Sequence, residues 1–575
     1  MFKLLRFMKK YLKEGICAPV FKVLEVCFEL IVPTVIAAII DKGIASNDKP
    51  YILKMCGVLV ILAVVGLGCT LVAQYFAAKA SVGFCCDIRS KLFEHISLFS
   101  YSQQDKLGSS TLITRLTGDL NQVQTGVNLT LRLALRSPFV VFGAMLMAFL
   151  VDSKAAVIFA VVIPLLTVVI FAVMLTAIPL YRGVQHALDN LLGKTVESLR
   201  GVRVIRAFCK ENDDINEFNE KNIILSFVQL KVGRLSALLN PITVVIINIA
   251  IALLIYKGAS RVDSGDLTKG QVVALYNYMT QILIELIKLA NLIINITKAI
   301  ACGNRIQALF ETEPEIVSGN IEKVNLTETA IELSNVDFSY NENADPALQN
   351  ISLTINKGET VGIIGVTGSG KSSLINLFSR FYDATKGTVK IFGEDIKNYN
   401  LKTLRNLFGI VPQKAVLFKG TIRDNMKMSA PDADDETIFE ALKIAQAEEI
   451  VKSKESGLDF IIEQEGKNLS GGQKQRLTIA RALARKPEIL ILDDSSSALD
   501  YATDAKLRTA LKELDSDKTV VIVSQRASSL RHADRIFVID DGKIIDSGTD
   551  AELNKRCTLY NEIRKTQFED KGDEQ

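Results

Sequence analysis

Hydrophobic and polar positions divide the chain into two halves that meet near residue 300. In the first half, apolar runs of the roughly 20 residues needed to cross a bilayer recur six times, at about 16 to 40, 53 to 79, 131 to 151, 154 to 180, 236 to 257 and 271 to 297. The segments at about 80 to 130 and 181 to 235 are long, polar and helix-patterned, so we expect the second and fourth spans to continue as helices outside the membrane. The pattern predicts an all-α transmembrane domain with six helices over residues 1–312.

The second half has a different pattern. Periodicity lapses over residues 313–329, which we interpret as a linker. Residues 330–575 then alternate short apolar strands with helical segments, the pattern of an α/β domain. Acidic residues at the C-terminus, from Glu569 to Glu574, are expected to form a solvated tail.

Charge and cysteine content narrow the class further. The net charge of +3 gives no reason to expect nucleic acid as a partner. Met1 to Gly15 combines basic and apolar residues, as in an amphipathic helix lying on a membrane surface. Six crossings return the chain to its starting side, and the basic N-terminus favours the cytoplasm for that side. The nine scattered cysteines show no metal spacing, so we expect reduced thiols in a multi-pass plasma-membrane protein.

Polar residues recur at helical spacing inside three of the spans. They are Asn277, Gln281, Glu285, Lys288, Asn291 and Asn295 on the sixth, Lys22, Glu25 and Glu29 on the first, and Arg132 and Arg136 on the third. Each set shares one helix face. Two interpretations remain open with equal weight: the stripes line a translocation cavity, or they bind helices together or lie on cytosolic extensions.

A glycine-rich loop carries the most specific chemistry of the second half. Its residues match the pattern G-x-x-x-x-G-K-[ST]: Gly365, Val366, Thr367, Gly368, Ser369, Gly370, Lys371, Ser372 and Ser373. A buried strand over Thr360–Ile364 and a helix over Ser373–Phe381 are predicted on either side. In this context, backbone N–H groups face a polyphosphate, Lys371 reaches its terminal phosphates and Ser372 is placed for Mg²⁺. We call residues 365–373 the phosphate loop.

Further motifs accompany the phosphate loop. These are Tyr340 before it, Gln413 after an apolar strand, the run Leu469, Ser470, Gly471, Gly472 and Gln473 before a helix, Asp493 and Asp494 after another strand, the run Ser497 to Asp500, and Gln525 after the strand Val520 to Ser524. Ser470 with the amides of Gly471 and Gly472 forms an anion site suited to a γ-phosphate.

Together these motifs resemble the ABC ATPase family, and the order of the halves resembles an ABC exporter half-transporter. The resemblance implies a P-loop NTPase domain that binds ATP and Mg²⁺. Tyr340 would stack on adenine, Asp493 and Ser372 would hold Mg²⁺, and Gln413 would sense Mg²⁺, water and the membrane domain. Residues 469–473 would be the family's signature loop, the name we use for them below, and this loop would serve the ATP of a second chain. Turns near Ser102–Gly108 and Ala207–Asp213 would couple the membrane helices to the ATPase domains.

Two residues depart from the family pattern at the reaction centre. Asp494 stands where a catalytic glutamate is usual, and Gln525 where a histidine is usual. Together with Gln413 they are the catalytic candidates. Since the binding residues are intact, we expect this site to hold ATP·Mg²⁺ and hydrolyse it slowly. The chain therefore resembles the degenerate-site subunit of heterodimeric bacterial multidrug ABC exporters.

That resemblance implies a non-identical half-transporter as partner, contact with membrane lipids, and export of drugs, lipids or other amphipathic compounds. Two alternatives stay open. One is a homodimeric exporter of peptides or lipids, and the other is a regulatory ATP-binding subunit of a membrane complex. Spans with charges of both signs leave the charge of the substrate undetermined.

Overall fold

The structure is a computed structural model that describes residues 2–341, 345–495, 498–513 and 517–568. Ser497 and the acidic tail, both singled out in the sequence, lie outside these residues. Contacts divide the chain into two compact units, Met1–Leu98 with Ser109–Glu313, and Phe99–Gly108 with Pro314–Gln575. The short helix α3 (Tyr101–Leu107) therefore packs with the second unit, although its neighbours in sequence belong to the first.

Among the described residues the first unit is entirely helical. Its elements are η1 (Phe2–Tyr11), α1 (Leu12–Ala38), η2 (Ile39–Ile44), α2 (Lys49–Ile96), α4 (Ser109–Thr114), η3 (Arg115–Asp119), α5 (Leu120–Leu133), α6 (Arg136–Val151), α7 (Ser153–Ala207), α8 (Glu211–Asp263) and α9 (Lys269–Glu311). Within the part of the chain that the structure describes, six helical segments are long and apolar enough to cross a membrane, with α4 to α6 forming one of them. The predicted six-helix membrane domain is confirmed.

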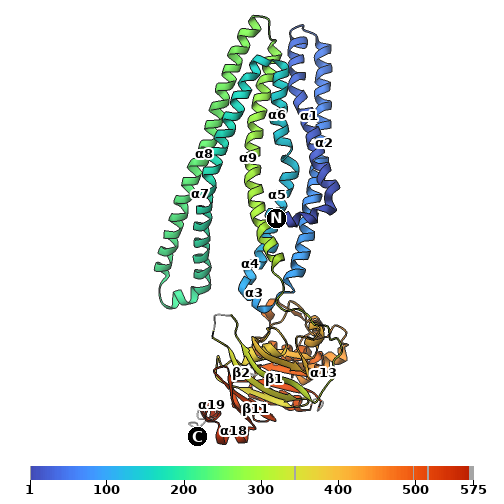
Figure 1. Cartoon of the computed structure of the whole chain (residues 1–575), viewed down its shortest axis with the longest axis vertical. Coiled ribbons are helices and arrows are strands. Elements are labelled where there is room, and N and C mark those ends of the chain that lie inside the picture. Colours follow the sequence, from blue (N-terminus) through green and yellow to red (C-terminus); the bar gives the residue numbers. More distant parts are fainter. Residues whose placement is uncertain (1, 342–344, 496–497, 514–516, 569–575) are drawn as a thin grey trace. The chain divides into compact units, whose positions relative to one another are not determined.

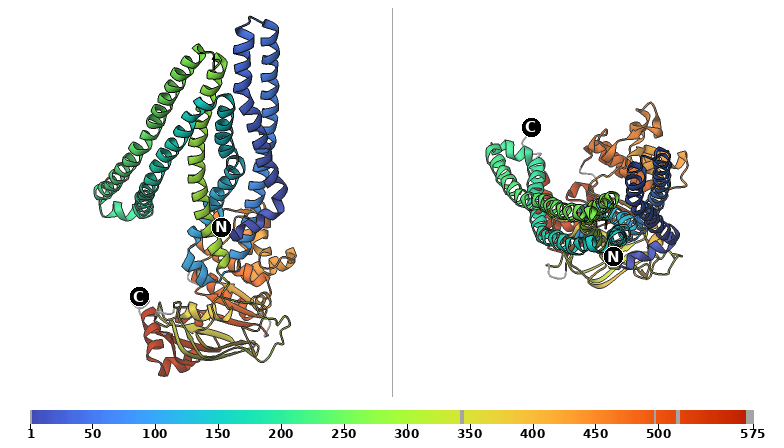
Figure 2. Two further views of the ribbon diagram at one scale, coloured as in Figure 1. Left: turned by 45° about the horizontal axis from the view of Figure 1, so that its top comes forward. Right: turned by 90° about the horizontal axis from the view of Figure 1, so that it is seen from above.

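Several of these helices are much longer than a bilayer requires. Helix α2 has 48 residues, α7 has 55 and α8 has 53, against roughly 20 for one crossing. The expected continuation of the second and fourth spans outside the membrane is therefore present. Helices α1 and α2 pack along each other, as do α7 and α8, while α9 contacts α1, α5 and α6 (Figures 1 and 2).

The second unit is built on two main sheets. The first is antiparallel, in the order β2 (Leu348–Asn356), β1 (Thr329–Phe338), β4 (Lys386–Ile391), β5 (Glu394–Asp395). The second has the order β12 (Lys543–Gly548), β11 (Arg535–Asp540), β3 (Thr360–Ile364), β10 (Thr519–Val523), β9 (Ile489–Asp493), β6 (Phe408–Val411). In it only β12 is antiparallel to its neighbour among the described strands. A small pair, β7 (Gly420–Thr421) and β8 (Ile461–Ile462), completes the strands.

Helices pack on these sheets to form a layered α/β domain. They are α10 (Lys371–Phe378), α11 (Leu401–Asn406), α12 (Ile422–Lys427), α13 (Asp435–Ile444), α14 (Glu448–Lys452), α15 (Gly471–Ala484), α16 (Tyr501–Lys512), α17 (Ala527–Leu530), α18 (Asp550–Arg556) and α19 (Thr558–Phe568), with short 3₁₀ turns at Gly457–Asp459 and Gln464–Gly466. Apolar residues of β1, β2, β4, β3 and α10 share one core. The predicted fold class, a helical membrane domain followed by an α/β domain, is confirmed.

The parallel strands decide where the site forms. Strands β3, β10, β9 and β6 are neighbours and run in one direction. Their carboxyl ends therefore lie at the same edge of the sheet, where α/β proteins bind ligands. The phosphate loop follows β3, Gln525 follows β10, Asp494 follows β9 and Gln413 follows β6.

Candidate functional site

The phosphate loop joins β3 to α10 in a conformation that needs its glycines. Gly368 has φ +87° and Gly370 has φ +99°, backbone values that residues other than glycine rarely adopt. A Cβ at Gly365 would stand 2.1 Å from the carbonyl oxygen of Ile539. The glycines thus let the backbone wrap closely at the start of α10, where helix N–H groups attract an anion.

Lys371 lies inside this loop and is buried. Its Nζ donates hydrogen bonds to the carbonyl oxygens of Gly365 at 2.9 Å and Val366 at 2.6 Å. Burial lowers the pKa of Lys371 from its usual value, while the carboxylates of Asp494 and Asp493 act in the opposite direction. The loop therefore holds the ammonium group of Lys371 against backbone carbonyl oxygens. Phosphate oxygens of a bound nucleotide would replace these carbonyl oxygens as its partners.

Ser372 and Asp493 form an oxygen pair suited to a hard cation. The Ser372 hydroxyl donates to Asp493 Oδ2 at 3.1 Å. Burial raises the pKa of the Asp493 carboxyl from its usual range. Hydroxyl and carboxylate oxygens are ligands that Mg²⁺ accepts, so these two residues fit the metal that the sequence predicts. Gln413, the third predicted ligand, donates from Nε2 to Asp494 Oδ2 at 3.5 Å.

The two residues that depart from the family pattern lie at the same edge. Asp494 has φ +44°, and its backbone N–H donates to the carbonyl oxygen of Val523 on β10 at 2.9 Å. The side chain of Gln525 accepts a hydrogen bond from Thr367 Oγ1 of the phosphate loop at 3.2 Å. Asp494 thus contacts Gln413, and Gln525 contacts the phosphate loop.

Tyr340 flanks the loop from the other sheet. Its hydroxyl is 2.9 Å from Ser373 Oγ, which places the ring beside the first turn of α10. Its ring packs edge-on against Phe338, with centroids 4.8 Å apart, and against Tyr382, with centroids 5.3 Å apart. The side chain is nevertheless exposed, so the ring is held in place with surface left for stacking.

Sequence reasoning did not single out Tyr382. The signal that could have found it is its position, since an aromatic pair, Phe381 and Tyr382, lies shortly after the end of α10 at Phe378.

The signature loop is a complete helix start. Ser470 caps α15: its Oγ accepts from the Gln473 N–H at 3.3 Å, and Gln473 Oε1 accepts from the Ser470 N–H at 3.0 Å. Leu469 is buried, whereas Ser470 and Gly471 are exposed. Gly471 and Gly472 present N–H groups that a helix leaves unpaired in its first turn, and Ser470 presents its hydroxyl beside them. The loop can therefore receive an anion from outside this chain.

Comparison with known proteins agrees with this geometry. Residues 16–286 match the ABC transporter transmembrane region, and residues 348–497 match the ABC transporter family. The uncharacterized ABC transporter ATP-binding protein YfiB of Bacillus subtilis is 36% identical over 573 residues, covering 100% of this chain and 99% of that protein. This chain belongs to the ABC transporter family. With a membrane domain and an ATPase domain in one polypeptide, it is an ABC exporter half-transporter and a multi-pass membrane protein.

Other relatives extend the comparison. The ATP-dependent lipid A-core flippase of Syntrophus aciditrophicus is 31% identical over 573 residues, covering 97% of this chain and 94% of that protein. The solved structure of a bacterial Atm1-family ABC exporter with ATP bound has a TM-score of 0.81 at 22% identity, covering 98% of both chains. This likeness shows that the half-transporter has the fold of that exporter.

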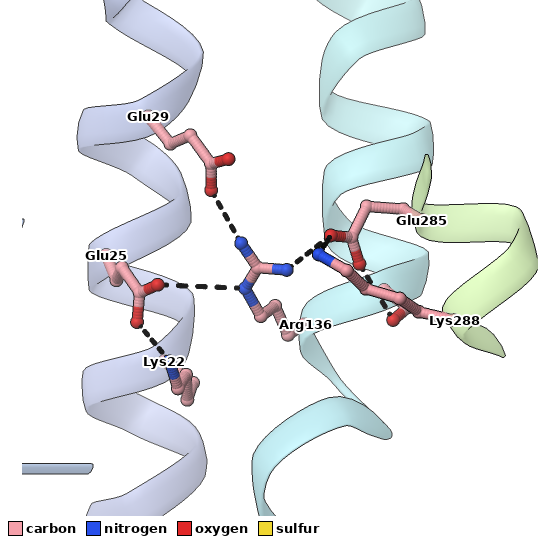
Figure 3. A network of polar contacts seen from close by, with 7 residues as sticks. Lys22, Glu25, Glu29, Arg136, Glu285 and Lys288 are labelled. Atoms are coloured by element: carbon pink, nitrogen blue, oxygen red, sulfur yellow. Dashed lines mark hydrogen bonds and ion pairs between the residues drawn. The ribbon is translucent and has the colours of Figure 1, made fainter. Parts of the chain in front are cut away.

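In the membrane domain of this ABC transporter, charged residues from each of the three predicted polar stripes meet. Lys22, Glu25 and Glu29 on α1, Arg136 on α6, and Glu285 and Lys288 on α9 form one set of charged contacts, which we call the ion cluster (Figure 3). Arg136 lies at its centre. It pairs with Glu29 at 2.8 Å and with Glu285, and its Nε is 3.8 Å from Glu25.

The remaining contacts balance the cluster. Lys22 pairs with Glu25 at 2.6 Å and Lys288 with Glu285 at 2.7 Å. Ser137 donates to the second oxygen of Glu285 at 3.0 Å. Three carboxylates thus face three cations across three helices, which favours the interpretation that these stripes bind helices together. Glu29 and Lys288 still have side chains 39% and 43% exposed.

Proposed function

We propose that this half-transporter is one subunit of a heterodimeric ATP-driven exporter, and that its own nucleotide site binds ATP with Mg²⁺ but hydrolyses it slowly. The observation that carries the proposal is the pair Asp494 and Gln525 at the edge of the sheet. Both replace the usual catalytic residues, and both lie against residues of otherwise complete motifs.

Binding is supported by the intact part of the site. Tyr340 offers a positioned ring for adenine, and Lys371 offers a buried cation for the phosphates. Ser372 and Asp493 would hold Mg²⁺, which when bound neutralises phosphate charge and orients the terminal phosphate.

Slow hydrolysis follows from the two replacements. Asp494 is one methylene shorter than glutamate, so its carboxylate is withdrawn by roughly 1.5 Å, and a displacement of about 1 Å can cost on the order of 100-fold in rate. Gln525 is a neutral amide and can neither carry positive charge nor titrate. General acid or base assistance is worth about 10²- to 10⁴-fold, and we infer that this site has lost much of it.

The complete signature loop supports a partner of a different kind. This loop would serve the ATP of the second chain. Ser470 and the backbone amides of Gly471 and Gly472 would therefore complete a nucleotide site whose catalytic glutamate belongs to that second chain. One fast and one slow site per transporter follow. ATP binding at both would close the ATPase dimer, and hydrolysis at the fast site would reopen it.

Cargo and orientation are part of the proposal. Relatives named lipid A-core flippases support amphipathic cargo, such as lipids or drugs. Basic residues of η1, namely Lys3, Arg6, Lys9 and Lys10, support a cytoplasmic N-terminus and a cytoplasmic ATPase domain in the plasma membrane. The expected surroundings are membrane lipids and a second half-transporter, without nucleic acid.

The test compares the two sites in the reconstituted pair. Asp494→Asn should lower ATP turnover by no more than about threefold, whereas glutamine in place of the partner's catalytic glutamate should lower it more than about 100-fold. Equal losses, or rapid turnover by this chain alone, would contradict the proposal and favour a homodimeric exporter. Failure of the active pair to move any amphipathic dye uphill in vesicles would favour a regulatory subunit.

A further inference from the structure

A row of aromatic side chains runs from the adenine candidate Tyr340 to helix α3. Tyr340 packs edge-on against Tyr382, with ring centroids 5.3 Å apart. Tyr382 in turn lies 6.2 Å from Tyr101 of α3, measured between ring centroids. Tyr101 also packs edge-on against Phe381 at 4.8 Å. Tyr340 is thus separated from Tyr101 of α3 by one side chain, Tyr382.

Tyr382 also holds α3 by a hydrogen bond. Its hydroxyl donates to Asp105 Oδ2 at 3.3 Å. Burial, with a further contribution from Asp105, raises the pKa of Tyr382 to about 12. The hydroxyl therefore stays protonated at physiological pH and remains a donor. Tyr382 consequently contacts α3 through both its ring and its hydroxyl.

The backbone that carries Tyr382 is fixed from both sides. The buried Arg380 donates from Nε to Asp383 Oδ1 at 2.8 Å and from Nη1 to the carbonyl oxygen of Val317 at 3.0 Å. These contacts span the residues on either side of Tyr382. Its ring can therefore move little without moving its neighbours.

A second, polar attachment keeps α3 on the same unit. Ser100, which caps α3, donates from Oγ to Glu315 Oε2 at 2.8 Å. Gln103 Oε1 accepts from the Glu315 N–H at 3.3 Å. This attachment lies on the segment before β1 and does not involve Tyr340. Of the two attachments, the one through Tyr382 is the one that leads to the nucleotide site.

We propose that Tyr382 is a positioning residue that couples nucleotide binding at Tyr340 to the position of α3. This inference rests on the proposed function in one respect, that ATP occupies this site. An adenine stacked on Tyr340 fixes that ring, the fixed ring restrains Tyr382, and Tyr382 holds Tyr101 and Asp105. By thermodynamic linkage, the factor by which bound nucleotide stabilises the position of α3 equals the factor by which that position of α3 raises nucleotide affinity.

The size of the effect follows from the contacts. One edge-to-face aromatic pair shifts an equilibrium by roughly two- to tenfold. The path consists of one edge-on contact, between Tyr340 and Tyr382, and one tilted contact, between Tyr382 and Tyr101, and it cannot transmit more than the weaker of the two. We therefore expect Tyr382→Leu to weaken nucleotide binding about three- to tenfold, and Tyr101→Leu, which acts from α3, about two- to fivefold.

The experiment measures the binding of a fluorescent, non-hydrolysable ATP analogue with Mg²⁺ to the full-length chain in lipid nanodiscs. The variants are Tyr382→Leu, Tyr101→Leu and the double variant. If Tyr382 carries the coupling, Tyr101→Leu has no further effect once Tyr382 is leucine. Additive effects in the double variant would overturn the proposal, as would an affinity for Tyr382→Leu within twofold of the original chain.

Conservative variants separate coupling from simple damage to the fold. Tyr382→Phe keeps the ring and should retain affinity within about twofold, and in that background Asp105→Asn should have no further effect. Tyr560→Phe is the matched control, because Tyr560 is a buried tyrosine of α19 whose hydroxyl bonds Asp550 at 2.6 Å. If it lowers nucleotide affinity as much as Tyr382→Leu does, the effect is general destabilisation and the proposal fails.

The readout does not depend on hydrolysis. Rapid turnover at this site would contradict the proposed slow site and leave the coupling intact. Absence of analogue binding by the original chain would overturn both.

Discussion

Replacing Arg136 by glutamine should weaken the membrane domain through the ion cluster. The side chain of Arg136 is 9% exposed and that of Glu285 is 4% exposed, so their charges have little access to solvent. The change removes the only cation that joins α1 to α9 within the cluster as described. It leaves three carboxylates facing two lysines (Figure 3).

The expected magnitude can be worked from the pairs that remain. Glu285 keeps Lys288 and Ser137, and Glu25 keeps Lys22. The uncompensated charge therefore falls on Glu29, whose side chain is 39% exposed and can be solvated. Breaking a buried ion pair costs about 3 to 5 kcal/mol in soluble proteins, whereas polar contacts between membrane helices average about 0.6 and reach about 1.7 kcal/mol. Because Arg136 pairs closely with both Glu29 and Glu285, we expect the change to destabilise the domain by about 2 to 3 kcal/mol.

The assay is thermal unfolding of the full-length protein in detergent. A loss of about 2 to 3 kcal/mol lowers the melting temperature by roughly 4 to 10 °C. Arg234→Gln on α8 is the matched control, since Arg234 is exposed, and it should change the melting temperature by less than about 2 °C. Arg136→Gln combined with Glu285→Gln should cost less than the sum of the two single changes. Additive losses, or a loss no greater than that of Arg234→Gln, would refute this reasoning.

Three further predictions concern the nucleotide site. Lys371→Ala should weaken nucleotide binding more than about 10-fold in a fluorescence titration, because the loop loses a charge-assisted contact to the phosphates. Restoring the usual residues together, Asp494→Glu with Gln525→His, should raise ATP turnover at this site more than about 10-fold; unchanged turnover would show that the two residues do not limit it. Burial raises the pKa of the Asp493 carboxyl, and Mg²⁺ binds its ionised form. Mg²⁺-dependent nucleotide binding should therefore fall on acidification at a higher pH than an ordinary aspartate would give, and Asp493→Asn should remove that pH dependence.

Local patterns allowed the phosphate loop to be predicted closely. The strand expected over Thr360–Ile364 is β3 itself. The helix expected over Ser373–Phe381 is α10, Lys371–Phe378, so the predicted helix ends too late. The physical reason is Arg380, whose φ of +51° breaks the helical path. No composition rule signals that conformation, because it depends on the contacts of Arg380 with Asp383 and Val317.

Contacts between distant segments were beyond the sequence pattern. Helical spacing showed that Glu285 and Lys288 share a face, but spacing along one helix says nothing about which helix that face meets. The pairing of Glu285 with Arg136 arises only when α6 packs against α9. The same holds for Tyr382, whose partner Asp105 lies 277 residues earlier in the chain.

The size of the aromatic coupling limits what the slow site can do in the proposed transporter. A ligand shifts a conformational equilibrium only by the ratio of its affinities for the two states. Contacts through Tyr382 supply roughly a tenfold ratio at most, far below the roughly 10⁴-fold needed to convert one state almost completely into another. ATP retained at this site would therefore favour the position of α3 against Tyr382 without making it the sole populated state. In the proposed transporter, the larger shift must come from closure of the ATPase dimer around both nucleotides, to which the signature loop of each chain contributes. ATP at the slow site would therefore bias the transporter toward the closed state, and hydrolysis at the fast site would determine when it reopens.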